Sequence, residues 1–346
     1  MAKNILITGG AGFVGSNFVH YLMAQYPDYG IMILDALTYA GSIDNVPPAM
    51  FDNDFQHYTF WHGNVCNSEI VNALVAKADI VVHFAAETHV TRSIFDNRQF
   101  YETDVLGTHA VANAVLRHAD SIDRFIHIST SEVYGTAERN VIDEDHPLNP
   151  RSPYASAKCG ADRLVYSYMA TYDFPAVIIR PFNLYGPRQH LEKVIPRFIT
   201  SVLENEPLTV HGNGHAARDF VFVEDLCRAL DLVIHAPREQ VAGEVFNVAT
   251  GQHHSINDLA RDIIAQMRAE DLASVAHVLE RPGQVNRHTG DASKIRQRLG
   301  WTPRTDWAAG LERTIAWYGT HHDWWQRQVW LRKVPLNYTS GITEYH

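Results

Sequence analysis

The sequence has few cysteines, no excess of positive charge and no long uninterrupted hydrophobic run. Its three cysteines, Cys66, Cys159 and Cys227, are widely spaced in 346 residues and form no Cys-x-x-Cys pair. They therefore predict free thiols, packed as small apolar side chains in a reducing compartment. The net charge of −10 argues against a nucleic-acid or anionic-membrane partner, because either would need a basic face.

Targeting and metal-binding segments are also missing. Residues 1–4 lead directly into the strand-like Ile5–Thr8, whereas a signal peptide needs a longer apolar stretch and a spanning helix about 20 apolar residues. The cytoplasm is therefore the expected compartment. The chain has 20 histidines, but no His-x-x-x-His or His-x-His pair with a nearby carboxylate stands out, so no metal is expected.

The first half of the chain alternates short apolar runs with longer amphipathic ones. This rhythm predicts an α/β fold, a doubly wound parallel sheet of the Rossmann type whose ligands bind at the carboxyl ends of the strands. The predicted strands are Asn4–Thr8, Ile31–Asp35, Ile80–Phe84, Arg124–Ser129 and Ala176–Arg180, and the predicted helices are Val14–Gln25, Ile70–Lys77, Phe100–His118 and Tyr154–Tyr172.

After residue 181 turn-rich pieces interrupt this rhythm and indicate a smaller, interleaved substrate domain. Residues 1–180 are expected to form the NAD-binding domain, with 223–250 returning to it through the strand Val245–Val248. Residues 181–222 and 251–346 would form the nucleotide-sugar-binding domain. Short helices are expected at 194–204, 223–236 and 256–267, and Trp317, Trp324, Trp325 and Trp330 are expected to pack a C-terminal helix.

Residues 4–16, NILITGGAGFVGS, have the pattern of a dinucleotide-binding turn. A strand runs into Gly9, Gly12 and Gly15, and a helix follows at once. These glycines permit the tight turn, the approach to a pyrophosphate and the packing of helix on strand. The second strand ends in Asp35, which can accept hydrogen bonds from ribose hydroxyls and would repel a 2′-phosphate. Because residues 35–44 contain no Arg or Lys, NAD is favoured over NADP.

A second motif lies at 152–158, SPYASAK, after the strand that ends in Ser129 and Thr130. Tyr154 and Lys158 are four residues apart and share a helix face. A neighbouring ammonium group is expected to lower the pKa of the phenol, so that Tyr154 can act as a base while Lys158 also holds the nicotinamide ribose.

With these motifs the chain resembles the extended short-chain dehydrogenase/reductase family, in its nucleotide-sugar epimerase/dehydratase branch, and most closely the NDP-glucose 4,6-dehydratases. The resemblance runs through LDALTYAGSIDNV (34–46), HFAAETHVTRSI (83–94), YGPRQHLEKVIPRFI (185–199) and GNGHAARDFVFVEDL (212–226). It implies NAD as cofactor and a dTDP- or UDP-hexose as substrate. A homodimer is expected through the helices at 100–118 and 154–172, because their apolar positions exceed one stripe.

The resemblance also implies residue roles. NAD would be bound by Gly9, Gly12, Phe13, Val14, Gly15, Asp35, Thr38, Asn64, Val65, Ala85, Ala86, Tyr154 and Lys158. The catalytic residues would be Thr130, Ser131, Glu132, Tyr154 and Lys158, and the substrate-binding residues Thr88, Asn183, Lys193, Arg218 and Arg287. Fixed cations suit a diphosphate in an otherwise acidic protein.

The chain departs from the dehydratase pattern at Thr130-Ser131-Glu132, where those enzymes carry Thr-Asp-Glu. There the Asp protonates the departing 6-hydroxyl, and a serine cannot replace that acid. Thr-Ser-Glu also resembles the motif of UDP-glucuronate decarboxylases. A 4,6-dehydratase is the preferred interpretation, because Glu132 provides a base that a 4-epimerase does not need.

Three alternatives stay open. A decarboxylase would need a cation for the substrate carboxylate, such as Arg92 or Arg281. A 4-epimerase would use the same 4-keto intermediate. A non-catalytic NAD-binding regulator would need none of Thr130, Tyr154 and Lys158.

Overall fold

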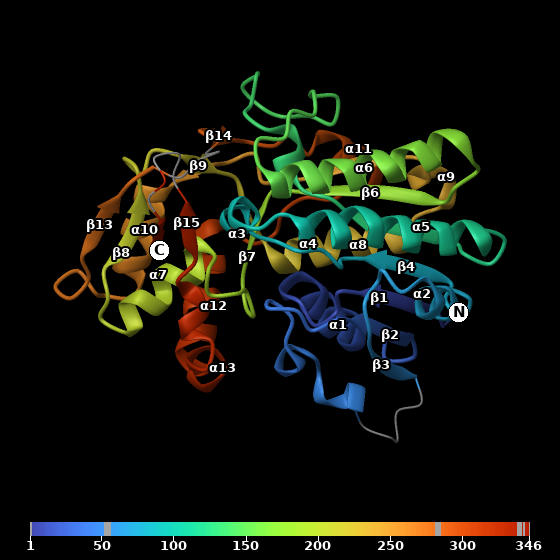
Figure 1. Ribbon diagram of the computed structural model, residues 1–346, viewed down its shortest axis with the longest axis horizontal. Coiled ribbons are helices and arrows are strands. Elements are labelled where there is room, and N and C mark those ends of the chain that lie inside the picture. The colour runs from blue at the N-terminus through green and yellow to red at the C-terminus, as the bar shows by residue number, and fades with distance from the viewer. Residues whose placement is uncertain (1, 52–56, 281–284, 338–340, 342, 346) are drawn as a thin grey trace.

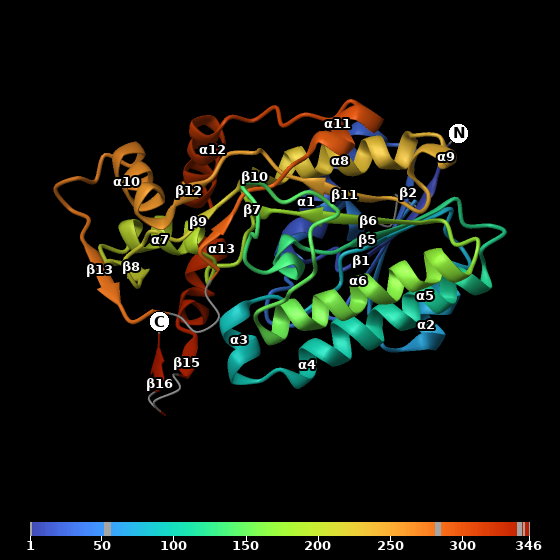
Figure 2. The ribbon, with the colours of Figure 1, turned by 90° about the horizontal axis from the view of Figure 1, so that it is seen from above.

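A seven-stranded parallel sheet lies at the centre of the molecule. The computed structural model describes residues 2–51, 57–280, 285–337, 341 and 343–345. The strand order is β11-β6-β5-β4-β1-β2-β3, and every pairing in the sheet is parallel. Helices cover both faces (Figures 1 and 2). This confirms the predicted doubly wound α/β fold, in which the strand order reverses between β1 and β4.

Six of the seven strands form where apolar runs predict them. The edge strand β3 was not predicted, because four of its five residues are at least partly exposed and the segment lacks a buried apolar run. The strands are β1 (Asn4–Thr8), β2 (Gly30–Asp35), β3 (Tyr58–His62), β4 (Ile80–His83), β5 (Arg124–Ile128), β6 (Ala176–Pro181) and β11 (Val245–Val248).

The sheet separates two hydrophobic layers, because alternate side chains of a strand point to opposite faces. Ile5 and Ile7 pack in one layer and Leu6 in the other. Figure 2 shows α1, α8 and α11 above the sheet and α2, α5 and α6 below it. These helices are α1 (Phe13–Gln25), α8 (Val223–His235), α11 (Ser293–Leu299), α2 (Ser68–Val75), α5 (Thr108–Arg117) and α6 (Pro153–Thr171).

The segment predicted as one regular helix over 100–118 is more complex. It consists of α4 (Arg98–Phe100), a π-helical stretch, η3 (Tyr101–Gly107), and α5. Gly107 explains the close approach at the end of η3, because a Cβ there would lie 2.7 Å from Cγ2 of Val65. Such π-helical turns are frequent at functional sites, and this one carries the buried Asp104 toward the cavity described below.

The chain returns to the sheet after residue 222, as predicted. Val245 of β11 pairs with Ile178 of β6, and α8 packs on α1. The exact division of the chain at residue 181 stays a prediction.

A second body of structure, on the left in Figure 1, has its own core, which includes Phe198, Tyr318 and Trp325. Trp324 and Trp325 are buried as expected, whereas Trp330 is 70% exposed, so the expectation that it packs a helix is wrong. The elements not yet named belong either to this second body or to connections around the sheet. They are η1 (Ile43–Asn45), η2 (Pro48–Phe51), α3 (Val90–Phe95), η4 (Ser131–Tyr134), β7 (Asn183–Tyr185), α7 (Val194–Leu203), β8 (Leu208–His211), β9 (Ala217–Arg218), β10 (Phe220–Phe222), α9 (Arg238–Val241), β12 (His254–Ser255), α10 (Ile256–Gln266), β13 (Val275–Val278), β14 (Arg287–His288), α12 (Trp307–Thr320), α13 (His322–Gln326), η5 (Val329–Arg332), β15 (Pro335–Asn337) and β16 (Thr343–Tyr345).

The cysteines are free thiols, as predicted, but they do not share one environment. Cys227 is buried and Cys159 half-buried, whereas Cys66 is exposed, contrary to the expectation of burial. Its Sγ donates to the carbonyl oxygen of Glu102. Within the described ranges, no helix is both long and apolar enough to cross a membrane.

Candidate active site

A cavity of about 460 Å³ opens at the carboxyl ends of the parallel strands, where ligands of doubly wound folds bind. Residues from the sheet region line one end, and residues from the second body line the other. Twenty of the predicted cofactor, catalytic and substrate residues lie in its wall: Gly9, Gly12, Phe13, Val14, Gly15, Asp35, Thr38, Asn64, Val65, Ala85, Ala86, Thr88, Thr130, Ser131, Glu132, Tyr154, Lys158, Asn183, Lys193 and Arg218.

The glycine turn forms one end of the cavity. Gly9 has a φ of +73°, and a Cβ at this position would lie 2.6 Å from the backbone nitrogen of Ala85. A Cβ at Gly15 would overlap the carbonyl oxygen of Gly9. Gly12 caps α1 without a side-chain hydrogen bond, so the first backbone amides of the helix are left for a ligand. This arrangement fits the pyrophosphate of a dinucleotide.

Asp35 lies at the end of β2 and is 8% exposed. Its Oδ2 accepts a hydrogen bond from the amide of Ala11 at 2.8 Å, and its Oδ1 accepts one from the amide of Leu37 at 2.8 Å. Burial raises the pKa of Asp35, although these two amides oppose the shift. Each carboxylate oxygen keeps a second acceptor site, so the residue fits a ribose with two free hydroxyls.

Tyr154 and Lys158 lie near the start of α6, where Lys158 is buried and Tyr154 is half-buried. The Tyr154 hydroxyl contacts the side chains of Thr130 and Thr88. Lys158 donates from Nζ to the carbonyl oxygen of Ile128 at 2.8 Å. Burial, followed by the carboxylates of Asp104 and Glu132, raises the pKa of Tyr154 above its usual range. The expectation of a lowered pKa is therefore wrong, because desolvation of the phenol is the largest effect on it.

Ser131 and Glu132 begin η4, which Thr130 caps through its hydroxyl at 3.2 Å from the amide of Glu132. Ser131 is 2% exposed. The Glu132 side chain is 18% exposed, and its Oε1 lies 3.9 Å from Nδ1 of His288. The cavity thus holds a carboxylate close enough to Tyr154 to affect its pKa.

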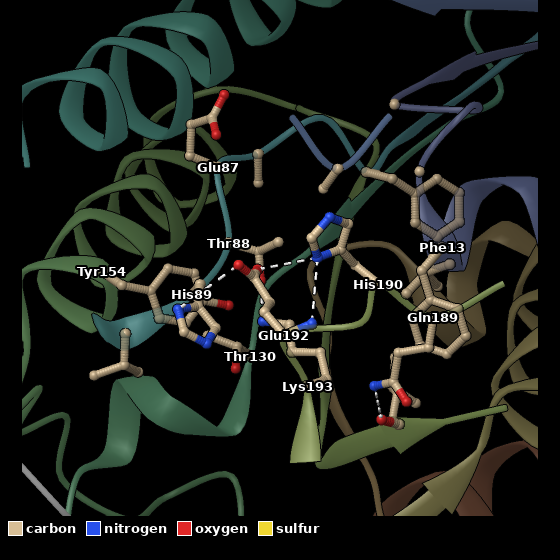
Figure 3. A pocket seen from close by; sticks show the side chains of 18 of the residues that line it. Phe13, Glu87, Thr88, His89, Thr130, Tyr154, Gln189, His190, Glu192 and Lys193 are labelled. Carbon is tan, nitrogen blue, oxygen red and sulfur yellow. Dashed lines mark hydrogen bonds and ion pairs between the residues drawn. The ribbon is translucent and has the colours of Figure 1, made fainter. Parts of the chain in front are cut away.

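A buried charge cluster that the sequence did not predict lies beside these residues. Figure 3 shows Glu192 between His89 and His190, with Thr130 and Tyr154 nearby. Arg92 donates from Nε to Oε2 of Glu192 at 2.6 Å. Burial acts to raise the pKa of Glu192, but the surrounding cations lower it to about 2. Glu192 therefore remains a carboxylate and forms an ion pair that largely neutralises Arg92.

The predicted substrate residues divide into four that line the cavity and one that does not. Lys193 donates from Nζ to Oγ1 of Thr88 at 3.1 Å. Oδ1 of Asn183 is buried and has no hydrogen-bond partner among the described residues, as expected of a group that awaits a ligand. Arg218 lines the cavity, whereas Arg287 lies outside its wall and donates to the carbonyl oxygen of Arg139 at 3.3 Å.

Comparison with known proteins supports the same assignment. Residues 6–314 match the family model described as GDP-mannose 4,6 dehydratase. The chain is 44% identical over 315 residues to the low-salt glycan biosynthesis protein Agl12 of Haloferax volcanii, covering 91% of this chain and 98% of that protein. It is 40% identical over 326 residues to a dTDP-glucose 4,6-dehydratase of Streptomyces niveus, covering 93% and 94%.

A solved structure agrees in fold. The dTDP-glucose 4,6-dehydratase DesIV of Streptomyces venezuelae, crystallised with NAD and TYD, superposes with a TM-score of 0.87 and 36% identity, over 94% of this chain and 99% of that chain. The matches extend over nearly all of the sheet region and the second body that together enclose the cavity. The chain therefore belongs to the GDP-mannose 4,6 dehydratase family, within the nucleotide-sugar dehydratase and epimerase branch of the extended short-chain dehydrogenases/reductases.

Proposed function

We propose that the protein is an NAD-dependent 4,6-dehydratase that converts a nucleotide-diphosphate hexose to its 4-keto-6-deoxy derivative. The observation that carries this proposal is the Glu132 carboxylate in the wall of the same cavity as Tyr154. A dehydratase needs one base to take the proton of the 4-hydroxyl during oxidation and a second base to remove the proton from carbon 5. The names of the similar proteins support the same activity.

The first step is oxidation at carbon 4. When bound, NAD supplies the acceptor for the hydride of carbon 4 and later returns that hydride to carbon 6. Tyr154 takes the proton of the 4-hydroxyl, and the hydroxyl of Thr130 holds the same oxygen. Lys158 is fixed by the Ile128 carbonyl, in a position to hold a ribose at the floor of the cavity.

The second step is loss of water. The ketone at carbon 4 acidifies the hydrogen on carbon 5, and Glu132 removes it. The electron pair of that C–H bond forms a double bond to carbon 6 as the C6–O bond breaks. Glu132 then passes its proton to the departing hydroxyl, which leaves as water. Ser131 only orients this hydroxyl, because a serine is too weak an acid to protonate it.

The arrangement of cations argues against a decarboxylase. Such an enzyme needs a free cation for the carboxylate of its substrate, but Arg92 is paired with Glu192 at 2.6 Å. Arg281, the other candidate, lies outside the described residues. A plain 4-epimerase has no use for Glu132, and a regulator has no use for the contacts of Tyr154 with Thr130 and Thr88.

The substrate is proposed to carry dTDP or UDP. Incubation of the purified protein with dTDP-glucose and with UDP-glucose should give a 4-keto-6-deoxy sugar from at least one of them. A 4-epimer as the sole product would establish the epimerase alternative. Carbon dioxide and a pentose, formed only from UDP-glucuronate, would establish the decarboxylase.

The cofactor assignment rests on Asp35 and on the glycine turn. We expect the purified protein to release NAD(H) on denaturation, because the hydride returns to the same sugar and the cofactor need not leave. Asp35→Asn should weaken NAD binding about tenfold, the effect of one lost hydrogen bond, and should weaken NADP binding less, since the charge that repels a 2′-phosphate is gone.

Titration of both cofactors by calorimetry tests this expectation. Asp44→Asn is the matched control, because Asp44 lies outside the cavity wall and pairs with Arg327 at the surface. Release of NADP(H) from the native protein, or an unchanged preference in Asp35→Asn, would contradict the assignment.

A homodimer through the face of η3, α5 and α6 remains a proposal. Large apolar side chains are exposed on these helices, among them Leu106 at 58% and Tyr166 at 47%. In Figure 1 the two helices α5 and α6 run side by side on one face of the molecule. Exposed apolar side chains on neighbouring helices are often found in subunit interfaces.

Light scattering at micromolar concentration should therefore give twice the mass of one chain. Leu106→Glu should shift the protein toward monomer, because a carboxylate would be buried without a partner. Leu232→Glu, on the opposite helix layer and 38% exposed, should leave the mass unchanged. A monomeric native protein would refute this interface.

A further inference from the structure

His288 lies behind the residues that line the cavity, with its ring directed toward Glu132. It lies on β14 beside β9, in register with Arg218, and its side chain is fully buried. Its Nδ1 is 3.9 Å from Oε1 of Glu132, which is ion-pair distance but longer than a hydrogen bond. Three charged or titratable groups act on its imidazole ring: Glu132 from η4, Arg218 from β9, and His146.

The contacts of the ring fix which nitrogen carries the hydrogen. Nε2 lies against the carbonyl oxygen of Gly135, and since a carbonyl can only accept, Nε2 is the donor. Burial lowers the pKa of His288, although Glu132 opposes the shift, so the ring is neutral near pH 7. Nδ1 is then a bare acceptor.

This acceptor is unsatisfied. Nδ1 of His288 is buried and has no hydrogen-bond partner in the described part of the chain. Buried polar atoms without a partner are rare in native proteins and call for a ligand, a water or a change of state nearby. The nearest ionisable oxygen is that of Glu132, which as a carboxylate has no hydrogen to offer. Once protonated, it has one.

We propose that His288 is a positioning residue that holds Glu132 in its protonated form during the elimination of water. This inference rests on the proposed dehydratase function. The C5–H bond breaks and its proton moves to the Glu132 carboxylate, while the electron pair forms the C4=C5 bond of an enolate. This pair becomes the C5=C6 bond only when the C6–O bond breaks. The new carboxyl group donates a hydrogen bond to Nδ1 of His288, about 1 Å closer than the present separation.

The proton then leaves with the 6-hydroxyl as the C6–O bond breaks, and His288 returns to its bare state with no net change. The proton count is therefore balanced within Glu132 and the substrate. This role accounts for how elimination can proceed although Ser131 is too weak an acid to protonate the 6-hydroxyl. One carboxyl group must serve as base and as acid, and it needs a partner that keeps the acid form oriented between the two tasks.

Two substitutions of His288 separate this role from a merely structural one. In His288→Asn an amide oxygen can stand where Nδ1 stands, but the contact with Gly135 is lost. In His288→Gln the amide nitrogen can reach Gly135 in place of Nε2, but no acceptor faces Glu132. If His288 positions Glu132, elimination should fall about tenfold or more in His288→Gln and less in His288→Asn. If it only supports the Gly135 turn, the order of the two variants should reverse.

The readout is single-turnover kinetics with dTDP-glucose or UDP-glucose, whichever the native protein converts. Absorbance of the reduced cofactor reports oxidation at carbon 4, and the 4-keto-6-deoxy product reports elimination. In His288→Gln oxidation should proceed at the native rate, and the reduced cofactor should accumulate before product appears. Equal losses in both steps, or no loss in either, would overturn the inference.

The pH profile gives an independent test. Protonation of Nδ1 removes the acceptor, so elimination by the native protein should fall with decreasing pH below the ordinary histidine range, because burial lowers the pKa of His288. Neither variant has a ring to protonate, so the pH profile of elimination should differ from the native profile in both variants, although the Glu132 base must be ionised in all three proteins. An unchanged pH profile in both variants would also contradict the proposal.

The matched control is His146→Gln. His146 is buried nearby, but its nitrogens face the backbone at Glu138 and Pro147, at 3.1 and 2.8 Å. It should keep the native ratio of the two steps. If the native protein itself makes no 4-keto-6-deoxy sugar, the proposed function fails. If it does and His288→Gln behaves like His146→Gln, only the role of His288 fails.

Discussion

Replacement of Tyr154 by phenylalanine is expected to lower turnover about 100-fold or more, the usual contribution of a general base. The hydroxyl of Tyr154 contacts Thr130 and Thr88 inside the cavity and is the group placed to take a proton from the sugar. Burial raises the pKa of this phenol, and the side chains of Thr130 and Thr88 oppose the shift. The phenylalanine variant loses this ionisable group altogether.

The fold of Tyr154→Phe should be preserved. The Tyr154 ring packs edge-on against Phe100 at 6.3 Å between centroids, and its backbone amide donates to Oγ of Ser93 at 3.1 Å. Both contacts survive the substitution. Tyr168→Phe on the same helix removes a hydroxyl that donates to Asn113 at 2.6 Å, outside the cavity wall, and serves as the matched control.

Steady-state turnover of the two variants, with thermal melting as a check of folding, decides the matter. A native rate in Tyr154→Phe would show that the base has been misassigned. A comparable loss in Tyr168→Phe would show that a hydroxyl on α6 matters for packing rather than for chemistry.

The largest single effect is expected at Glu132. Glu132→Gln should abolish the loss of water, because an amide can neither take the proton from carbon 5 nor give one to the 6-hydroxyl. Ser131→Ala should cost only about tenfold, one ordinary hydrogen bond. The two residues are neighbours on η4, so each serves as the control for local disturbance by the other.

Incubation in deuterium oxide distinguishes the outcomes. The proton that Glu132 takes from carbon 5 leaves with the water. When the hydride returns to carbon 6, carbon 5 must take a new proton, so in deuterium oxide carbon 5 of the final product should carry deuterium. Reduced cofactor should still form in Glu132→Gln, since oxidation at carbon 4 precedes the missing step. Product formation by Glu132→Gln, or a loss in Ser131→Ala as large as in Glu132→Gln, would contradict this division of labour.

The parts of the site that could be predicted from the sequence are those whose residues lie close together in the chain. The glycine turn, the Asp35 at the end of β2, and the pair of Tyr154 and Lys158 each form a short motif with a distinct chemistry. Their positions follow from the strand–turn–helix rhythm, which also predicts the sheet. Arg218 and Lys193 also line the cavity, as the resemblance to the NDP-glucose 4,6-dehydratases implies.

The parts that could not be predicted depend on contacts between distant segments. Arg92 and Glu192 are 100 residues apart, and no motif or spacing in the sequence predicts an ion pair between them. The meeting of His288 with Glu132 depends on the register of β14 against β9. The π-helical η3 was not predicted because its apolar positions also satisfy a regular helix. Arg287 and its strand neighbour His288 both lie outside the cavity wall, and only His288 approaches Glu132.

The return of β11 to the sheet has a consequence for how the protein is made. As the chain leaves the ribosome, β6 emerges about seventy residues before its partner, and its Ile178 edge stays open until Val245 arrives. The hydrophobic layer that contains α1 is completed even later in synthesis, because it includes Ile295 and Trp301. Folding therefore cannot proceed half by half in order of synthesis. A single cut, wherever it is made between β6 and α11, separates strands or helices that share one core, so the cofactor-binding part has no independent existence as a fragment.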